Sequence, residues 1–372
     1  MNLDFLPEDL KRSVRWKLHE GELALLRRAH PLRYLFVEVT RRCNLACSYC
    51  GSSCNGKEQR PEMTTAEWIG VMEQIAADFD ATQVMVAVMG GEPTVKEGIF
   101  DFMAALQRLK FPWGMVTNGQ TMDAGVAHRV VSLGMRSVSL SMDAPPELND
   151  KLRGKGSSQK VIDAVGHLKA AGFNGKLEIM STITAPAVEH LPEMRKLVAE
   201  RKVPLWRVVP VMPIGRAAVN QELVPSHAQL RQIIEYVSEA RKDGLMPAPE
   251  FCEEGFLGEQ FEGQARTHLW YCLAGISIGG ILCDGRVGAC PELGDAFVQG
   301  EDVRRERFKD LWEQRYQVFR DRGWTDKGRC GSCDQFSRCQ GGSLHLYHSP
   351  QNDPLRCLYL DAVKAPPPPP RR

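Results

Sequence analysis

Residues 31–220 alternate between short apolar runs and longer segments with helical periodicity, and this alternation restricts the fold more than any other feature of the sequence. Strands are predicted over 34–40, 83–90, 113–117, 137–143, 176–184 and 205–212, and helices over 64–79, 98–109, 124–134, 159–172 and 191–202. Strands that alternate with helices form parallel sheets with crossover helices on their faces. Doubly wound sheets and β/α barrels both fit this pattern, and both bind ligands at the carboxyl ends of their strands.

Within the alternating part, Thr64 or Thr65 is expected to cap the first predicted helix.

The rest of the chain lacks this regular alternation of strands and helices. The predicted division is an N-terminal extension over 1–30, a barrel over 31–220, a connecting helical segment over 221–270, a small cysteine-rich domain over 271–360 and a disordered Pro-rich tail over 361–372.

Composition excludes several classes of protein. Charged residues make up 25% of the chain and the formal net charge is +1, so we expect no nucleic-acid partner. No apolar run is long enough to span a bilayer, and the charged N-terminus lacks the apolar core of a secretory signal. We therefore expect a soluble, cytoplasmic protein without a membrane partner.

The twelve cysteines fall into two separate groups. Four lie within residues 43–54, eight lie between residues 252 and 357, and none lies between these groups. In a reducing compartment, clustered cysteines indicate metal ligands or redox groups before disulfides. The sequence therefore predicts two cysteine-built sites.

The first group follows the first predicted strand directly, with Cys43, Cys47 and Cys50 spaced C-x3-C-x2-C. A tetrahedral zinc ion would need a fourth ligand, which Cys54 could supply in a closed structural site. An iron–sulfur cube held by three cysteines would instead keep one iron open for a small molecule. Both arrangements fit this loop.

The loop CNLACSYC (43–50) resembles the signature of the radical S-adenosylmethionine (SAM) superfamily, in which an aromatic residue, here Tyr49, precedes the last cysteine. The resemblance implies a [4Fe–4S] cluster on Cys43, Cys47 and Cys50 whose open iron binds SAM. It also implies an electron donor such as flavodoxin or ferredoxin, reductive cleavage of SAM to methionine and a 5′-deoxyadenosyl radical, and hydrogen abstraction from a substrate. The sequence assigns no catalytic acid, base or nucleophile.

The same resemblance assigns SAM contacts to the ends of later strands. Several of the residues named below also have a structural interpretation: a turn for the Gly-Gly-Glu-Pro segment, a helix cap for Asp143 and a solvated cation for Arg153. Asn118 is an additional weak match, and Arg216 in the Pro-x-Gly-Arg-Ala stretch is a candidate to face the site. The implied SAM-binding residues are Gly90, Gly91, Glu92, Pro93, Ser141, Asp143 and Arg153.

The second cysteine group begins with a predicted β-hairpin over 272–290 that turns at Asp284-Gly285. A C-x2-C pair such as Cys330 and Cys333 would by itself indicate zinc. The whole pattern resembles the SPASM extension of radical SAM enzymes, with 285–290 as its Gly-x4-Cys element. The resemblance implies an outer auxiliary iron–sulfur cluster on Cys330, Cys333, Cys339 and Cys357.

An inner auxiliary cluster is less complete, because the family's further cysteine falls on Ser343. Cys272 and Cys290 are its remaining candidates, whereas Cys283 is displaced from the usual place and Cys252 stands alone. The inner cluster could have an open iron, use the Ser343 oxygen, be shared with the C-x2-C pair or be absent. Two auxiliary clusters are the favoured prediction.

These features predict an α/β fold, a partial (β/α)6 TIM-like barrel followed by a small cysteine-rich, cluster-binding domain. The predicted function is a radical SAM oxidoreductase that modifies a peptide or protein side chain. One alternative is a small-molecule substrate such as a tetrapyrrole, since some relatives with a Pro-x-Gly-Arg-Ala stretch act on such molecules. The other is a non-catalytic iron–sulfur or zinc protein.

Overall fold

One ten-stranded sheet runs through the computed structural model, which describes residues 7–55, 61–252, 255–293 and 295–364. The strand order is β10-β9-β8-β1-β2-β3-β4-β5-β6-β7, and all neighbours from β8 to β7 are parallel. The strands are β1 Tyr34–Thr40, β2 Met85–Gly90, β3 Trp113–Thr117, β4 Ser137–Ser141, β5 Lys176–Ile183, β6 Leu205–Pro210, β7 Pro249–Phe251, β8 Ile278–Ile281, β9 Arg286–Gly288 and β10 Gln299–Asp302.

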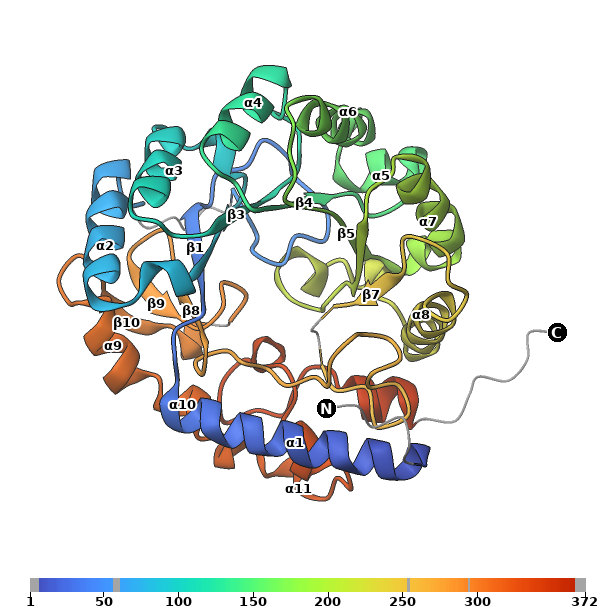
Figure 1. Ribbon diagram of the computed structural model, residues 1–372. Coiled ribbons are helices and arrows are strands. Elements are labelled where there is room, and N and C mark those ends of the chain that lie inside the picture. The colour runs from blue at the N-terminus through green and yellow to red at the C-terminus, as the bar shows by residue number, and fades with distance from the viewer. Residues whose placement is uncertain (1–6, 56–60, 253–254, 294, 365–372) are drawn as a thin grey trace.

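Helices surround this sheet, with α2 to α8 on its outside and α1 beside α10 and α11 at the lower side of Figure 1. The helices are α1 Glu8–Ala29, α2 Thr65–Asp78, α3 Ile99–Arg108, α4 Ala124–Ser132, α5 Pro146–Arg153, α6 Ser157–Ala170, α7 Leu191–Glu200, α8 His227–Ala240, α9 Phe308–Arg315, α10 Gln317–Arg320, α11 Gly328–Gly331 and α12 Phe336–Cys339.

The six predicted strands and five predicted helices are all present, which confirms the α/β fold. The structure adds the parallel strand β7 and the helices α1 and α5, and it pairs β8, the first strand of the predicted hairpin, in parallel with β1. With three residues, the first of them a proline, β7 is too short to give a period-two pattern, so the sequence did not reveal it. The predicted disordered tail began too early, because residues 361–363 belong to the helical turn Tyr359–Val363, in which Ala362 and Val363 are buried. The rest of that tail, from residue 365, lies outside the described residues.

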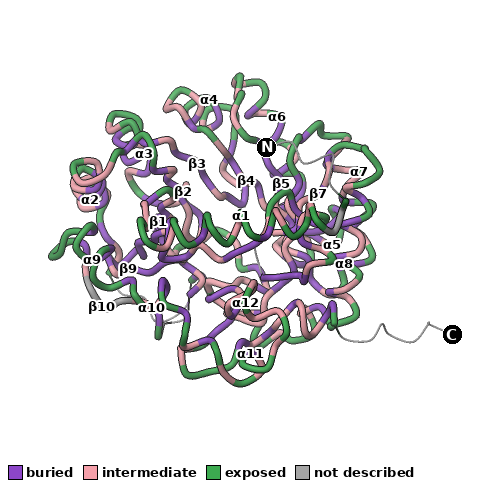
Figure 2. Tube along the Cα trace, turned by 60° about the horizontal axis from the view of Figure 1, so that its bottom comes forward, coloured by how far each residue is buried: buried purple, intermediate pink, exposed green. Residues whose placement is uncertain are grey.

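Alternating burial explains how these segments fold. In β1, Leu35, Val37 and Val39 are fully buried, and Figure 2 shows strands that are mostly buried inside helices with exposed outer faces. Helix α2 begins where Thr64 accepts a hydrogen bond from the backbone N–H of Glu67, whose carboxylate accepts one from the Thr64 N–H. This capping box confirms the predicted start of the helix.

The C-terminal hairpin extends the sheet. Strand β8 pairs in parallel with β1, and β9 returns antiparallel to β8. The predicted turn is present: Gly285 has a φ of 89°, a left-handed conformation that favours glycine. The cysteine-rich region is therefore hydrogen-bonded to the barrel strands at its first strand, while its division into a separate domain stays a prediction.

Helix α1 packs against the C-terminal half of the chain. Trp16 meets Phe256 edge-on at 6.0 Å between ring centroids, and Leu23 belongs to a small core with Tyr271 and Ile276. The predicted N-terminal extension is thus mostly a helix with a buried face. Neither this helix nor any other in the described residues is both long enough and apolar enough to cross a bilayer.

Trp312 on α9 joins the C-terminal helices to the sheet. Its indole N–H donates to the backbone oxygen of His30 at 3.0 Å, and its ring lies 4.7 Å from that of Tyr316. A Cβ on Gly279 of β8 would come within 3.3 Å of the Trp312 ring, so the helix lies directly on the strand.

We predict that Trp312→Ala lowers the free energy of unfolding by about 3–5 kcal/mol, because it leaves a large cavity at this junction. The exposed neighbour Gln314 gives the control, since Gln314→Ala should change that free energy by less than about 0.5 kcal/mol. The midpoint of urea unfolding, followed by circular dichroism, measures both. Equal midpoints for the two variants would contradict this account of the junction.

Candidate active site

The first cysteine loop, residues 41–55, leaves the carboxyl end of β1 without regular secondary structure. The backbone N–H of Cys43 donates to Asn55 Oδ1 at 2.9 Å, and Asn55 Nδ2 donates to the Cys43 oxygen at 2.9 Å. This reciprocal pair closes the loop on itself. The three predicted ligands Cys43, Cys47 and Cys50 therefore lie on one closed turn at the carboxyl end of the sheet.

The segment after β6 holds the same loop from the opposite side. Arg216 Nε donates to the Cys47 oxygen at 2.7 Å, and its Nη1 donates to the Cys54 oxygen at 2.8 Å. Gly215 has a φ of 57°, and a Cβ there would come within 2.1 Å of the Gly51 oxygen. The Gly-Arg pair thus fits the loop backbone closely, and Arg216 binds loop carbonyls, a role that the sequence did not indicate.

The thiols of the loop lie in different environments. Burial is the main cause that raises the pKa of Cys43 and the pKa of Cys47. A hydrogen bond from the buried Cys54 thiol lowers the pKa of Cys50 to about 5. Cys54 is thus the immediate neighbour of one predicted ligand.

The predicted Gly-Gly-Glu-Pro element lies at the end of β2, against the start of this loop. Gly91 N–H donates to the Thr40 oxygen at 2.7 Å, and Glu92 N–H donates to the Arg42 oxygen at 2.9 Å. A Cβ on Gly91 would come within 2.3 Å of the Arg42 oxygen. The glycines therefore permit close approach of two backbone segments, while their predicted contact with SAM stays a prediction.

Glu92 itself is fully buried, and protein groups use both of its carboxylate oxygens. One oxygen accepts from Thr94 Oγ1 at 2.6 Å, the other accepts from the Asn118 N–H at 2.8 Å, and Thr117 Oγ1 donates to both. Burial raises the pKa of this carboxyl. Glu92 thus ties the end of β2 to the end of β3.

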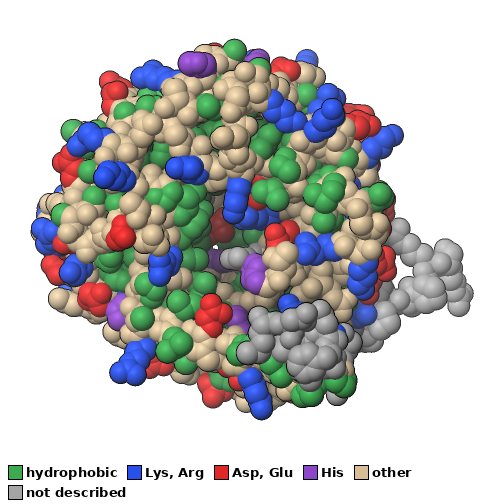
Figure 3. Space-filling model, viewed as in Figure 1, with side chains coloured by type: hydrophobic (Ala, Val, Ile, Leu, Met, Phe, Trp, Pro, Cys, Tyr) green, Lys and Arg blue, Asp and Glu red, His purple; other side chains and the backbone are tan. Residues whose placement is uncertain are grey.

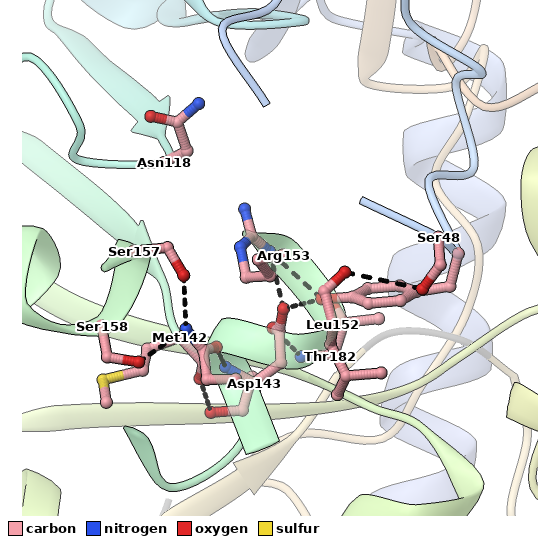
Figure 4. Close-up of polar contacts among 12 residues, drawn as sticks. Ser48, Asn118, Met142, Asp143, Leu152, Arg153, Ser157, Ser158 and Thr182 are labelled. Atoms are coloured by element: carbon pink, nitrogen blue, oxygen red, sulfur yellow. Dashed lines mark hydrogen bonds and ion pairs between the residues drawn. The ribbon is translucent and has the colours of Figure 1, made fainter. Parts of the chain in front are cut away.

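Asp143 lies just beyond β4 and joins three elements beneath the loop. Its Oδ2 accepts from Arg153 Nη1 at 2.6 Å and from the Tyr49 hydroxyl, and its Oδ1 accepts from the Thr182 N–H at 2.6 Å. Figure 4 shows Arg153 and Thr182 converging on this carboxylate. Burial and the Asp143 charge raise the pKa of Tyr49 well above its usual value, so the phenol stays protonated as a donor.

Arg153 also acts on the loop directly. Its positive charge lowers the pKa of Cys47, and only the opposite effect of burial on that pKa is larger. Asn118 reaches the loop too: its Nδ2 donates to Asn44 Oδ1 at 2.7 Å and lies 3.6 Å from the Cys43 sulfur. Ser141 is half-buried at the end of β4. The predicted SAM-binding residues therefore gather at the ends of β2 and β4 and on α5, around the cysteine loop.

A hollow lies at the centre of the ring of strands and helices. Figure 3 shows acidic and histidine side chains inside it, with hydrophobic side chains on its wall. A hollow within a partial barrel can admit a ligand that a filled barrel core would exclude.

Comparison with known proteins agrees with this geometry. The family model of the radical SAM superfamily matches residues 37–198. The mycofactocin maturase MftC of Mycolicibacterium smegmatis is 31% identical over 312 residues, which cover 82% of this chain and 76% of that protein. The chain belongs to the radical SAM superfamily.

More distant similarities extend over the same part of the chain. The AdoMet-dependent heme synthase of Nitratidesulfovibrio vulgaris is 24% identical, with 84% of this chain and 87% of that protein covered. The PqqA peptide cyclase of Granulibacter bethesdensis is 24% identical, with 84% of each covered. The structure of Streptococcus suis SuiB bound to precursor peptide SuiA has a TM-score of 0.66 at 18% identity and covers 90% of this chain and 78% of that one. The chain is thus a radical SAM enzyme with a SPASM-type C-terminal region.

The four cysteines predicted for an outer auxiliary cluster lie together in this region. Burial is the largest cause that raises the pKa of Cys339, and the charges of Cys357, Cys330 and Cys333 come next. The other three thiols therefore lie near Cys339. Tyr347 Oη lies 3.8 Å from the Cys330 sulfur, and the Leu360 N–H donates to the Cys357 sulfur at 3.5 Å. Polar groups thus already surround the sulfur atoms.

The spacing of these thiols argues against a single zinc ion. Bonds of about 2.3 Å place the sulfurs of a tetrahedral zinc site about 3.8 Å apart. Among the described residues, one group of three possible metal ligands has its ligand atoms within 4.8 Å of one another: Cys290, Glu292 and His345. This group contains none of the four outer cysteines, and none of Cys43, Cys47 and Cys50. In the part of the chain that the structure describes, neither cysteine set is therefore drawn together as tightly as the ligands of one zinc ion would be.

The remaining cysteines separate in a way that the sequence could not reveal. Cys283 lies at the turn of the hairpin, where its N–H donates to Glu38 Oε2 at 3.3 Å. Cys290 follows β9, at the opposite end of the hairpin, and its cysteine neighbours are Cys272 and Cys252. Cys252, which stands alone in the sequence, is near enough to Cys290 for its charge to raise the pKa of Cys290.

We predict that Asp143→Asn lowers the free energy of unfolding by about 3–5 kcal/mol, because it leaves the Arg153 charge without its buried partner. Asp163→Asn is the matched control, since Asp163 is exposed on α6 and its loss should cost less than about 0.5 kcal/mol. Urea unfolding of both proteins measures the difference. If Asp143→Asn unfolds at the parent's midpoint, the ion pair does not support the loop.

Proposed function

We propose that this radical SAM enzyme modifies a side chain of a peptide or protein. The observation that carries the proposal is the 31% identity with MftC, a maturase by name, over 82% of the chain. The superfamily model matches only residues 37–198, so the similarity must extend well beyond the part that all radical SAM enzymes share. Similarity outside the shared barrel favours a shared type of substrate.

Other relatives divide between two substrate classes. The PqqA peptide cyclase acts on a peptide by its name, and SuiB was solved with a precursor peptide, although SuiB supports only the fold. The similarity to AdoMet-dependent heme synthase favours a tetrapyrrole as the second candidate substrate. The lower identity with heme synthase, 24% against 31%, makes a tetrapyrrole the weaker candidate.

In this proposal Cys43, Cys47 and Cys50 hold the [4Fe–4S] cluster, and Cys54 stays outside it as a hydrogen-bond partner of Cys50. The donor set fits, because three widely spaced thiols on a loop closed by Asn55 leave one corner of a cube open. When bound and reduced, the cluster would supply one electron to cleave SAM into methionine and the 5′-deoxyadenosyl radical.

The chain's own residues would orient SAM beside that corner. Gly90, Gly91 and Pro93 would offer backbone to its amino group, since the Glu92 carboxylate is already used by Thr94, Thr117 and Asn118. The Arg153 charge, close to Cys47 and held by Asp143, would attract the SAM carboxylate. Ser141, at the end of β4, is our further candidate contact.

We further propose two auxiliary clusters: an outer one on Cys330, Cys333, Cys339 and Cys357, and an inner one that includes Cys272 and Cys290. A flavodoxin or ferredoxin would supply the electron in the cytoplasm, where thiols stay reduced.

The substrate class can be tested with fractionated extract of the source cells. Reduced enzyme and SAM are incubated with the fraction below 10 kDa, either untreated or digested with protease, and release of 5′-deoxyadenosine is measured. A peptide substrate predicts stimulation that protease treatment removes. Stimulation that survives digestion, or that purified tetrapyrrole reproduces, would overturn the peptide proposal and favour the second candidate.

We predict that Cys43→Ala, Cys47→Ala and Cys50→Ala each abolish 5′-deoxyadenosine release and remove about four iron atoms per reconstituted chain, since each removes one of only three cluster ligands. Cys54→Ala is the matched control from the same loop and should keep both. Anaerobic iron analysis and chromatography of the nucleoside measure the outcomes. Loss of iron in Cys54→Ala equal to that in Cys50→Ala would mean a closed four-cysteine site and would overturn the proposal.

A further inference from the structure

Three further thiols lie on segments that are distant along the chain, one after the edge strand β7 and two on either side of the C-terminal hairpin. Cys252 directly follows β7, and its N–H donates to the Val208 oxygen of β6 at 2.8 Å. Cys272 precedes β8, and Cys290 follows β9. The charges of Cys272 and Cys252 both raise the pKa of Cys290, although less than burial and Glu292 do, so both thiols lie in the vicinity of Cys290. Three thiols are one short of a complete cluster ligand set.

A histidine lies close to one of these thiols, Cys290. A ring nitrogen of His345 lies within 4.8 Å of both the Cys290 sulfur and a Glu292 carboxylate oxygen. His345 belongs to the short 3-10 turn Leu344–Leu346, two residues beyond Ser343, where the family pattern would place a cysteine. The helical turn thus brings an imidazole to Cys290.

The His345 ring also has an unused polar atom. Its Nε2 is buried and has no hydrogen-bond partner among the described residues. Leaving a buried donor or acceptor unsatisfied costs about 1–3 kcal/mol, so such an atom requires an explanation, and an unseen metal is one. This observation is independent of the cysteine pattern and points to the same place.

We propose that Cys252, Cys272, Cys290 and His345 together hold the inner auxiliary iron–sulfur cluster, with the imidazole as the fourth ligand. Imidazole is an established ligand of iron in clusters, whereas the harder oxygens of Ser343 and Glu292 suit iron–sulfur centres less well. Cys283 is excluded from this set, because it lies at the other end of the hairpin beside Glu38. The assignment rests on the proposed second auxiliary cluster, and it does not depend on the substrate class.

A nitrogen ligand has a consequence for electron transfer. Replacing thiolates by imidazoles raises the reduction potential of an iron–sulfur cluster. The inner cluster should therefore accept an electron more readily than the outer cluster with its four thiolates. Such a centre is suited to accept an electron, and His345→Cys should lower its potential.

Pulsed electron paramagnetic resonance can detect the nitrogen directly. The experiment uses the full chain with Cys43, Cys47 and Cys50 replaced by alanine, so that only the auxiliary clusters are reconstituted and reduced. We expect a ¹⁴N coupling from one cluster, replaced by a ¹⁵N coupling when the histidines are labelled. It should vanish in His345→Ala and in His345→Cys, where the introduced thiolate keeps the cluster assembled. It should persist in His348→Ala, whose exposed ring lies three residues away.

Iron analysis separates the ways in which this assignment can fail. The same background protein should bind about eight iron atoms, two cubes, with the second cube lost in Cys252→Ser and kept in Cys283→Ser. About four iron atoms, with or without a zinc ion, would mean that the inner cluster does not exist and would overturn both proposals. About eight iron atoms without a ¹⁴N coupling, or with one that persists in His345→Cys, would keep the inner cluster and overturn the histidine ligand.

Discussion

The arrangement of the active site depends on how a fifteen-residue loop without regular secondary structure, residues 41–55, is held in one shape. Hydrogen bonds from other strand ends, made by both backbone and side chains, hold the loop in this shape. At the end of β2, the Gly91 N–H donates to the oxygen of Thr40, just before the loop, and the Glu92 N–H donates to the oxygen of Arg42. Beyond β6, the Arg216 side chain donates to the Cys47 and Cys54 carbonyl oxygens. The Asp143 carboxylate accepts a hydrogen bond from the hydroxyl of Tyr49 in the loop. Because loop backbone carries polar groups that must be satisfied, these contacts fix where the three thiols lie.

The second organising feature is the way the sheet passes from the barrel into the cysteine-rich region. Strand β8 pairs with β1, so the hairpin that leads to Cys290 starts beside the strand that leads to Cys43. At the other edge, β7 delivers Cys252 toward the same hairpin. Apolar side chains pack around the C-terminal region: Trp16 of α1 packs with Phe256 and Trp270, and Trp312 packs with Phe308 and Tyr316. The cysteines of the proposed inner centre therefore flank strands of the same sheet that carries the SAM site, whereas those of the outer centre lie beyond its last strand.

Much of the fold was predictable, because long alternating segments carry strong periodic signals. The six strands, five helices, the Thr64 cap and the Gly285 turn were all expected and found. What escaped prediction is short or depends on partners. Strand β7 has three residues, and Arg216 was expected to face a ligand but binds loop carbonyls instead. Nothing in the spacing of Cys252 or His345 links them to Cys290, because that link runs through the sheet.

The sequence alone determined the chemistry that the chain can support: the C-x3-C-x2-C loop after the first strand, the glycines that allow close backbone approach, and four outer cysteines with cluster spacing. Such local patterns act through residues close together along the chain, so they are legible without a structure. The tertiary structure alone decided that both Glu92 carboxylate oxygens bind groups at the strand ends, that Cys283 is separated from Cys290, and that His345 lies close to Cys290. These are contacts across large sequence separations, fixed by strand pairing and core packing.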